Sequence, residues 1–302
     1  MDTPIKLPGL IVPPLTPFTA ELKVDEKALL AGVDYVVEDC NAAMVIAAGV
    51  EAQEYHYLTL EERKHLIDRT FEYVDRRRPV AVGISHPSFK IAVELAHHAQ
   101  RIGADAVQLL APLRPFGGEP TQQELLDYFE LISRETDLPV ILYLNPGPGA
   151  NVSIADTIAL AKLERVKYVK ESSRDLSRVS RLIAEIELEG HAKYFTTMQM
   201  LLITLELGGS GITLPPPAAM LANKVIQAFV AGDMKEAARL QLQFALFPAR
   251  WMHHGLTPTL KAALKILGIS AGDPYPPYPP ISGKDLQALE AYIKRTDLEL
   301  KT

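Results

Sequence analysis

The stretch Val166–Lys170 reads VKYVK, and Glu171–Ser173 (ESS) follows it directly. Apolar residues at alternate positions predict a buried β-strand over 166–170. A lysine at the end of such a strand has two interpretations. Its ammonium group can reach the rim and point to water, because charged residues are seldom fully buried. Alternatively it is a Schiff-base lysine, since an amine among apolar neighbours loses hydration, its pKa falls, and the free amine attacks carbonyl groups.

Seven other short apolar runs are predicted as strands: Leu10–Val12 running on to Thr16–Phe18, Ala43–Ala48, Val80–Ile84, Ala106–Leu110, Val140–Tyr143, Tyr194–Thr196 and Gly211–Thr213. Helical patterns separate them, over residues 25–37, 60–76, 88–101, 121–134, 154–163, 176–187 and 198–206. This alternation predicts parallel strands with crossover helices. Eight such units favour an α/β fold, a closed (β/α)8 TIM barrel with its active site at the carboxyl ends of the strands.

An open, doubly wound sheet is the alternative architecture. No strand is followed by the Gly-x-Gly-x-x-Gly pattern, which argues against a dinucleotide site. From Met220 onward the chain predicts helices only, over 220–231, 233–251, 257–267 and 283–295, with the proline-rich Pro274–Pro280 between the last two. We therefore expect a barrel catalytic domain over residues 1–220 and a C-terminal helical bundle over 221–302.

Composition excludes several classes of protein. The net charge is -6, so no basic field is available to hold nucleic acid. Cys40 is the single cysteine, which excludes a disulfide framework and a thiolate metal cluster. The N-terminus lacks the pattern of a signal peptide, and no stretch approaches the roughly 20 apolar residues of a membrane span. We expect a soluble cytoplasmic protein with no membrane or nucleic-acid partner.

The histidine pairs do not predict a metal site. His97-His98 fall in a predicted helix and His253-His254 near a helix end. Neither pair has the i, i+4 spacing of a helical metal site, so both are interpreted as structural.

The ends of the predicted strands, taken together, carry a family resemblance. In order they read Thr16-Pro17-Phe18, Tyr143-Leu144-Asn145-Pro146, Lys170-Glu171-Ser172-Ser173 and Gly208-Gly209-Ser210-Gly211-Ile212-Thr213. This set resembles the dihydrodipicolinate synthase / N-acetylneuraminate lyase family of class I aldolases. The resemblance covers essentially the whole chain, including Leu256–Pro258 and Pro280–Ser282 in the helical tail. It favours the Schiff-base interpretation of Lys170.

The resemblance implies a (β/α)8 barrel with a C-terminal helical bundle, usually assembled as a homotetramer. Members condense, cleave or dehydrate 2-oxo acids, commonly pyruvate, and need no metal or organic cofactor. Lys170 and Tyr143 fall on the catalytic lysine and tyrosine of the family, and Gly211, Ile212 and Thr213 fall at the substrate. A phenol one strand from the lysine can relay protons to and from the carbinolamine. Without the lysine, the favoured interpretation of Tyr143 is an ordinary barrel aromatic.

The loop after the second strand departs from the family pattern. Relatives usually have Gly-Thr-Thr-Gly-Glu there, whereas this chain reads GVEAQE over Gly49–Glu54. Glu54 fits the end of the motif. Ungapped alignment puts Glu51 and Ala52 on the two threonines, and a small gap puts Val50 and Glu51 there, so both hydroxyl groups that hold the substrate carboxylate are missing.

A carboxylate at this position has several interpretations. Two anions in one small pocket repel, and one of them tends to be neutral. Glu51 is then a general acid/base, or the substrate carboxylate binds elsewhere, or the substrate is not pyruvate. Alternatively Glu51 points to solvent from its loop.

Three further departures bear on the substrate and the assembly. Pro148 stands where synthases and sialic-acid lyases carry an arginine for the second substrate's acid group, which counts against a true dihydrodipicolinate synthase. Leu113–Phe116 replaces a segment with paired tyrosines, one of which crosses a subunit interface in synthases, so a homodimer stays possible beside a homotetramer. Arg114 in this segment is a substitute cation for the substrate or a rim charge.

Tyr55–Tyr57 is an aromatic cluster for packing or an interface, with His56 also a possible acid/base.

The function that follows is a Schiff-base-forming lyase, an aldolase or a hydratase/dehydratase acting on pyruvate or another 2-oxo acid. The main alternative is a non-catalytic protein that binds 2-oxo acids or sugar acids on the same scaffold. A weaker alternative is a barrel enzyme that uses Glu51 and Glu54 as paired catalytic carboxylates. It is weaker because both residues lie on one loop, and nothing sets them on opposite sides of a substrate.

Overall fold

The computed structural model describes residues 4–51 and 54–301. Eight parallel strands form a closed barrel in chain order, as the sequence predicts. The strands are β1 Gly9–Val12, β2 Met44–Ala47, β3 Val80–Gly83, β4 Ala106–Leu110, β5 Val140–Leu144, β6 Val166–Glu171, β7 Lys193–Thr196 and β8 Gly211–Thr213. Nearly every strand residue is buried, which explains why parallel strands read as continuous apolar runs.

The α-helices are α1 Glu26–Asp34, α2 Leu60–Val74, α3 Phe89–Ile102, α4 Gln122–Ser133, α5 Ile154–Ala161, α6 Leu176–Leu182, α7 Leu201–Glu206, α8 Ala219–Val230, α9 Met234–Gln241, α10 Leu256–Ile266 and α11 Gly283–Ile293. Several begin where a side chain caps them. Thr59 and Thr121 form capping boxes with Glu62 and Glu124, which satisfies backbone N–H groups at the starts of α2 and α4. Gly103 ends α3 in the left-handed conformation with φ 83°.

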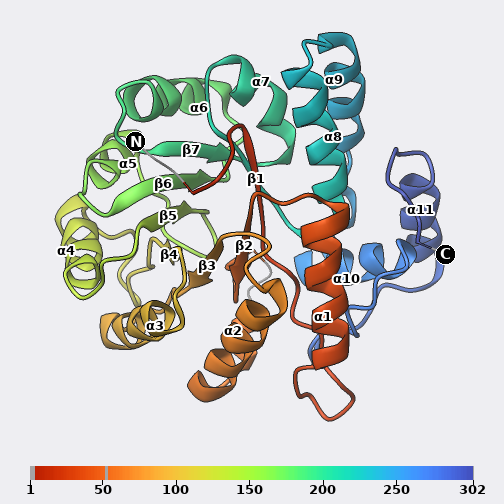
Figure 1. Ribbon diagram of the computed structural model, residues 1–302, viewed down its shortest axis with the longest axis horizontal. Coiled ribbons are helices and arrows are strands. Elements are labelled where there is room, and N and C mark those ends of the chain that lie inside the picture. Colours follow the sequence, from red (N-terminus) through yellow and green to blue (C-terminus); the bar gives the residue numbers. More distant parts are fainter. Residues whose placement is uncertain (1–3, 52–53, 302) are drawn as a thin grey trace. The chain divides into compact units, whose positions relative to one another are not determined.

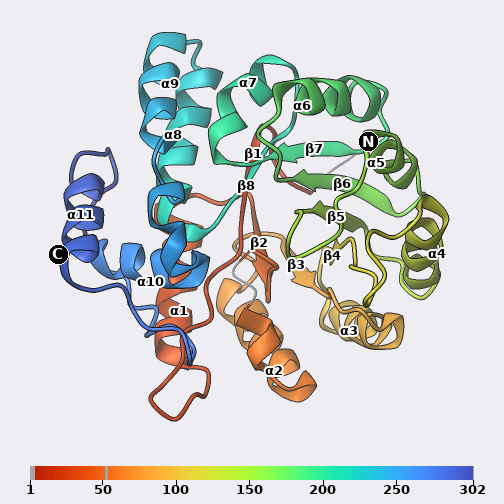
Figure 2. The same ribbon diagram turned by 180° about the vertical axis from the view of Figure 1, so that it is seen from behind.

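The chain divides into two compact units. The first comprises residues 1–9 and 79–213 and contains strands β3–β8; α3, α4, α5 and α6 surround the outside of its strands (Figure 1). The second comprises residues 10–78 and 214–302 and contains β2, α1, α2 and helices α8–α11. Within it α8 and α9 lie side by side, as the reverse view also shows (Figure 2). The division into domains at residue 220 stays a prediction.

Some predicted boundaries are wrong. The helix predicted over 233–251 is interrupted: α9 ends at Gln241, short 3₁₀ turns cover Leu242–Phe244 and Ala249–His254, and Pro248 lies between them. Proline has no N–H for the helical ladder, so a continuous helix cannot pass through it. Likewise β1 ends at Val12 rather than near Phe18, because Pro13 and Pro14 follow and cannot donate ladder hydrogen bonds.

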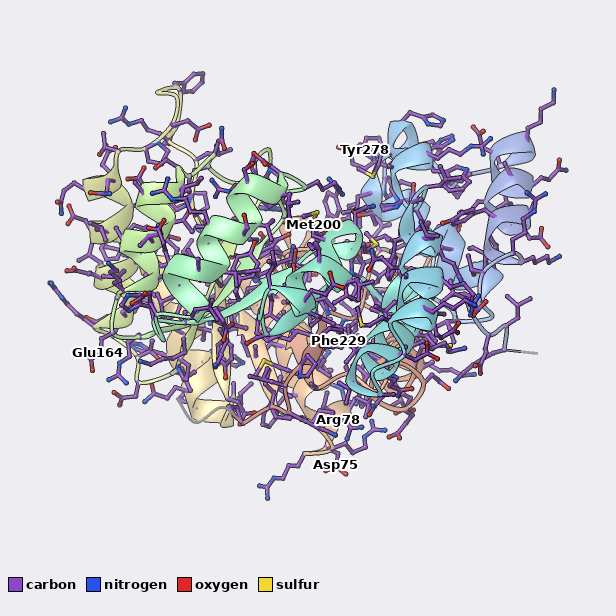
Figure 3. The ribbon with its side chains drawn as sticks, turned by 90° about the horizontal axis from the view of Figure 1, so that it is seen from above. Asp75, Arg78, Glu164, Met200, Phe229 and Tyr278 are labelled. Atoms are coloured by element: carbon purple, nitrogen blue, oxygen red, sulfur yellow. The ribbon has the colours of Figure 1, made fainter. Side chains whose placement is uncertain are left out.

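Two predicted helices end in a wider turn. The segments Tyr35–Asp39 and Ile183–Glu187 continue α1 and α6 as π-helical turns. The helix α2 stops at Asp75, a left-handed residue with φ 46°, and Arg78 lies nearby in the same loop (Figure 3). Throughout the described residues, each helix is too short or too polar to cross a bilayer.

Candidate active site

Lys170 lies in β6, next to its carboxyl end, and is only 3% exposed. The interpretation that its ammonium group points to water from the rim is therefore wrong. Its Nζ lies 2.9 Å from the Ser172 hydroxyl, to which it donates a hydrogen bond. Burial removes hydration from the amine, and one hydroxyl holds it in place. These are the conditions under which a lysine side chain acts as a nucleophile toward a carbonyl carbon.

Tyr143 is paired in register with Lys170 on the neighbouring strand β5. Lys170 Nζ lies 5.0 Å from the centre of the Tyr143 ring, which is also buried. Asn145 Nδ2 donates to the phenol oxygen at 3.1 Å. The strand register thus brings an amine and an oriented phenol together, and a phenol so close can exchange protons with groups that form on the amine.

The residue after the lysine fixes the turn that leaves β6. Glu171 is 2% exposed and forms an ion pair with Arg178 at 3.3 Å. It also accepts a hydrogen bond from the Ser173 backbone N–H at 3.2 Å and one from the Tyr194 hydroxyl at 3.4 Å. Burial, followed by the neighbouring Glu171 charge, raises the pKa of Tyr194, which keeps this phenol neutral. The network ties the loop that carries Ser172 to α6.

The strand β8 contributes Gly211, Ile212 and Thr213, all buried. Gly211 has φ 143°, and a Cβ there would lie 2.0 Å from the backbone oxygen of Gly9, so no other residue fits. The hydroxyl of Thr213 is buried with no hydrogen-bond partner among the described residues. Since buried hydroxyl groups are normally paired, it is available to a ligand.

Glu51 lies in the second unit, in the loop after β2, and is 6% exposed. The interpretation that it points to solvent is therefore wrong. A Cβ on Gly49 would lie 3.0 Å from Glu51 Oε2, so the carboxylate folds back on its own loop. Ala52, the second residue aligned with the threonines of the family, lies outside the described residues.

Glu54 is not available as a paired catalytic carboxylate. Its Oε1 lies 2.7 Å from Lys261 Nζ of α10, and the two side chains are 1% and 2% exposed. The Thr16 backbone N–H donates to Oε2 at 2.9 Å, and Lys261 donates to the carbonyl oxygens of Thr16 at 2.9 Å and Asp273 at 3.0 Å. Burial raises the pKa of Glu54 and lowers that of Lys261, while their mutual attraction opposes both shifts. The pair joins the two loops at the ends of β1 and β2 to the helical tail.

The aromatic cluster after Glu54 packs within its own unit. The Arg63 guanidinium lies 4.1 Å from the centre of the Tyr55 ring, and burial raises the pKa of Tyr55 to about 12. Tyr57 stacks on Tyr275 with ring centroids 4.5 Å apart. Packing therefore accounts for both tyrosines of the cluster, while His56 is exposed.

Arg114 lies on the surface of the first unit. It forms an ion pair with Glu124 at 2.7 Å and donates to the Gly117 carbonyl oxygen at 3.2 Å. The Thr121 backbone and then Arg114 lower the pKa of Glu124 to about 2. A role for Arg114 toward substrate stays a prediction.

Sequence reasoning assigned no role to Ser172, Asn145, Arg178 or Lys261. Ser172 and Asn145 each lie two residues after a predicted catalytic residue, so their spacing carried a signal. Arg178 and Lys261 act from helices, where a basic residue usually indicates a solvated face. Only the packing reveals that they hold buried carboxylates.

Comparison with known proteins agrees with this architecture. The model of the dihydrodipicolinate synthetase family matches residues 6–296. The 4-hydroxy-tetrahydrodipicolinate synthase of Moorella thermoacetica is 30% identical over 288 residues, which cover 94% of this chain and 96% of that relative.

Solved structures are similar in fold over almost the whole chain. One is a dihydrodipicolinate synthetase, described as putative, from Pseudomonas aeruginosa, with a TM-score of 0.85, 25% identity, and coverage of 95% of this chain and 98% of that one. Another is a prophage protein of the dihydrodipicolinic acid synthase family from E. coli K12 in complex with pyruvate. Its TM-score is 0.85 at 23% identity, with 96% of this chain and 98% of that one covered. The chain belongs to the dihydrodipicolinate synthetase family, whose members are class I aldolase-like lyases.

Proposed function

We propose that this protein is a lyase that forms a Schiff base between Lys170 and the keto carbon of a small 2-oxo acid, pyruvate or a close analogue. The observation that carries the proposal is the buried amine of Lys170 beside the phenol of Tyr143 at the paired ends of β5 and β6. The reaction is an aldol cleavage or condensation, or a hydration or dehydration, at the carbon next to the imine.

The chemistry needs only groups of this chain. The neutral amine attacks the keto carbon and gives a carbinolamine, which loses water to form an iminium. The iminium withdraws electrons, so a proton leaves the adjacent carbon, or a bond to that carbon breaks, and an enamine results. Tyr143 supports the proton transfers, since its hydroxyl is held by Asn145 at 3.1 Å. No metal or organic cofactor takes part in this scheme.

The carboxylate of the 2-oxo acid needs donors that the substituted loop after β2 no longer supplies. Thr213 offers one, because its buried hydroxyl has no hydrogen-bond partner among the described residues. The backbone of Gly211 and Ile212 lies in the same short strand. Glu51, buried in its own loop, is proposed as a general acid/base. Arg114 is proposed as a surface cation that attracts the anionic substrate.

The proposal excludes dihydrodipicolinate synthesis as the main activity. Pro148 stands where synthases carry the arginine that binds the second substrate, and both hydroxyls of the Thr-Thr motif are lost in this chain. We expect pyruvate with the aldehyde substrate of the synthases to give little or no product. A turnover equal to that of an authentic synthase under the same conditions would contradict this part of the proposal.

The assembly and location follow from the same resemblance. We propose a homotetramer, or a homodimer if the substituted Leu113–Phe116 segment no longer supports the second interface, in the cytoplasm. Light scattering coupled to size-exclusion chromatography of the intact chain distinguishes the two assemblies.

The decisive experiment is borohydride trapping with pyruvate and a panel of 2-oxo acids, read by intact-protein and peptide mass spectrometry. We expect one adduct per chain on Lys170, and the acid that gives most adduct indicates the substrate class. Lys170→Ala should give none. Lys167→Ala is the matched control, since Lys167 lies in the same strand but is partly exposed, and it should be labelled like the unaltered protein. Absence of an adduct with every acid would overturn the proposal and favour a binding protein on the same scaffold.

A further inference from the structure

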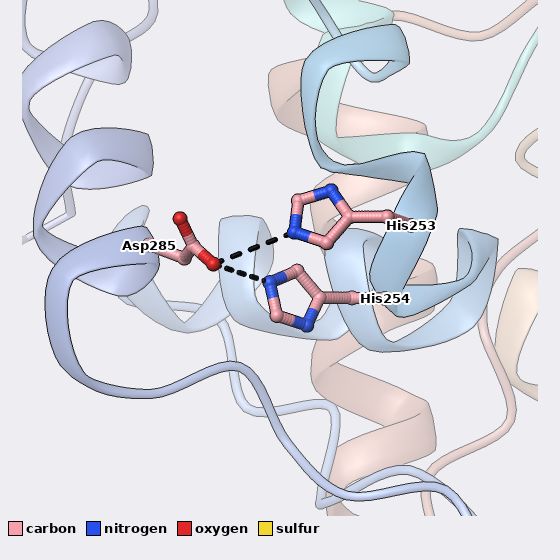
Figure 4. Close-up of side chains that lie close together, drawn as sticks. All are labelled: His253, His254 and Asp285. Atoms are coloured by element: carbon pink, nitrogen blue, oxygen red, sulfur yellow. Dashed lines mark hydrogen bonds and ion pairs between the residues drawn. The ribbon is translucent and has the colours of Figure 1, made fainter.

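Two histidines and one aspartate converge on the surface of the second unit (Figure 4). His253 and His254 end the 3₁₀ turn Ala249–His254, and Asp285 lies in the first turn of α11. Nε2 of His254 lies 2.8 Å from Asp285 Oδ2, and Nε2 of His253 lies 3.4 Å from the same oxygen. One atom from each of the three side chains is thus directed at one small volume.

The arrangement of the two rings is unusual for neighbours in sequence. Consecutive residues of a 3₁₀ turn point about 120° apart, because the turn has three residues. Here the ring centroids are only 4.1 Å apart, with the planes inclined by 41°. The chain leaves this turn at Gly255, which has φ 92° and ψ 159°. Both imidazoles present their Nε2 atoms to Asp285 of α11.

We propose that His253, His254 and Asp285 form a binding site for a divalent transition-metal ion such as Zn²⁺. The three ligand atoms lie within 4.8 Å of one another, and the ligand atoms of a tetrahedral zinc site are about 3.3–3.5 Å apart. Small side-chain rotations would bring the three ligand atoms to the separation of a zinc site. Water would complete the coordination, since His253 is exposed.

The chemistry of the donors selects the class of ion. Two imidazole nitrogens and one carboxylate suit Zn²⁺, Ni²⁺ or Cu²⁺, whereas Mg²⁺ and Ca²⁺ prefer all-oxygen sites. Without metal, the Nε2–H group of His254 donates a hydrogen bond to Asp285. Metal ions bind a neutral imidazole through its unprotonated nitrogen, so binding through Nε2 requires the tautomer of His254 with its single proton on Nδ1.

A bound ion would join two segments that are far apart in the chain. His254 and Asp285 are separated by 31 positions, and α11 follows the proline-rich segment Pro274–Pro280. The bridge therefore holds the start of α11 against the turn before α10. We expect the bound ion to stabilise the helical tail. This effect does not depend on the chemistry proposed for Lys170.

This site could not be predicted from the sequence. The third ligand comes from another helix, and adjacent histidines lack the i, i+4 spacing of a helical metal site. The other adjacent pair, His97-His98, supplies a matched control. It also lies on the surface, in α3, but His97 Nε2 bonds the backbone oxygen of Glu135 at 2.9 Å. No third ligand completes a site there among the described residues.

The test uses the full chain without a histidine tag. Zn²⁺ binding is measured by equilibrium dialysis with elemental analysis, and amide hydrogen exchange of residues 283–293 is compared with and without Zn²⁺. We expect one Zn²⁺ per chain, slower exchange in α11, and no effect of Mg²⁺. The variants His253→Gln/His254→Gln and Asp285→Asn should weaken Zn²⁺ binding at least about 10-fold. The control variant His97→Gln/His98→Gln should bind Zn²⁺ as the unaltered chain does.

Two results would overturn the proposal. One is an unaltered chain that binds no Zn²⁺, which would leave the cluster as an ordinary ion pair. The other is equal Zn²⁺ affinity in the unaltered chain and in the His253→Gln/His254→Gln variant. Circular dichroism of each variant establishes that it is folded, which is expected because the substituted side chains lie at the surface.

Discussion

Lys261 and Glu54 form an ion pair at 2.7 Å from which solvent is excluded, with side chains 2% and 1% exposed. The lysine also donates to two backbone carbonyl oxygens, and the glutamate accepts from one backbone N–H. Such additional hydrogen bonds are what make a buried ion pair tolerable, because each ion has lost its hydration. The pair holds the loop that carries Glu51.

Removal of one partner should destabilise the protein strongly. Lys261→Met leaves the Glu54 carboxylate buried without its counter-ion, and the free energy of unfolding should fall by about 3–5 kcal/mol. Glu54→Gln/Lys261→Met should recover part of that loss, since no charge stays uncompensated. Denaturant unfolding monitored by circular dichroism measures the free energy of unfolding of the single and the double variant.

The control is Lys294→Met, which removes an exposed ion pair with Glu290 at 2.6 Å. Its effect should stay within about 1 kcal/mol. If Lys261→Met proved no more destabilising than Lys294→Met, the pair would have no structural role.

Tyr143→Phe should separate binding from proton transfer. Loss of the hydroxyl should lower kcat about 10²–10⁴-fold while KM changes little, because the phenol acts on protons rather than on substrate affinity. Borohydride trapping of pyruvate should still label Lys170, although more slowly. Steady-state kinetics and mass spectrometry provide the two measurements.

Tyr168→Phe is the matched control, since Tyr168 is a buried tyrosine of β6 that packs near Phe195. Its kcat should stay close to that of the unaltered enzyme. Equal kcat for the Tyr143→Phe and Tyr168→Phe enzymes would argue that Tyr143 is only a barrel aromatic.

Thr213→Val should raise KM without loss of stability. The buried hydroxyl has no protein partner among the described residues, so its removal costs the fold little. A hydrogen bond to a charged carboxylate contributes about 1.5–3 kcal/mol, so KM for the 2-oxo acid should increase roughly 10-fold or more. Thr204→Val removes a similar buried hydroxyl, also unpaired within the described part of the chain, from helix α7 rather than from a strand end, and should leave KM unchanged. A Thr213→Val enzyme with normal KM and lower stability would show that the hydroxyl serves the fold.

Glu124 should make the start of α4 sensitive to acid. Its pKa is lowered from 4.5 to about 2 by the Thr121 backbone N–H and then by Arg114. A carboxyl group with a depressed pKa contributes stability above its unfolded pKa and loses it as the pH falls. This contribution should therefore be complete above about pH 4.5 and disappear toward pH 2.

Glu124→Gln should flatten the stability profile in that interval, and Arg114→Gln should flatten it in part. Denaturant midpoints collected across the acid range give the profile. The same Arg114→Gln enzyme tests the two interpretations of the arginine. A raised KM at neutral pH would favour a cation for substrate, and an unchanged KM would favour a rim charge.

The fold was predictable because barrel strands are buried on both faces. Runs such as Ala106–Leu110 and Gly211–Thr213 therefore stand out from the polar helices between them, and their bounds agree with the structure. The interruption of the helix predicted over 233–251 was missed, since the apolar pattern continues past Gln241, where α9 ends, and through Pro248, which has no N–H for the helical ladder.

The candidate site was predictable only in part. Lys170 and Tyr143 lie at strand ends, where sequence order and register coincide, so their approach follows from the fold. The burial of Glu51 and the Glu54–Lys261 pair did not follow from the sequence. Partners 207 positions apart, from 54 to 261, leave no periodic signal, and an acidic loop residue ordinarily faces water.

The lysine that neutralises Glu54 comes from α10, in the helical tail. The tail is therefore not an interchangeable module. Consider a chimera that joins this barrel to the tail of a relative without a basic residue at the position of Lys261. In it the Glu54 carboxylate would be buried without a counter-ion. Substitutions at positions 54 and 261 should be tolerated during divergence only when they occur together.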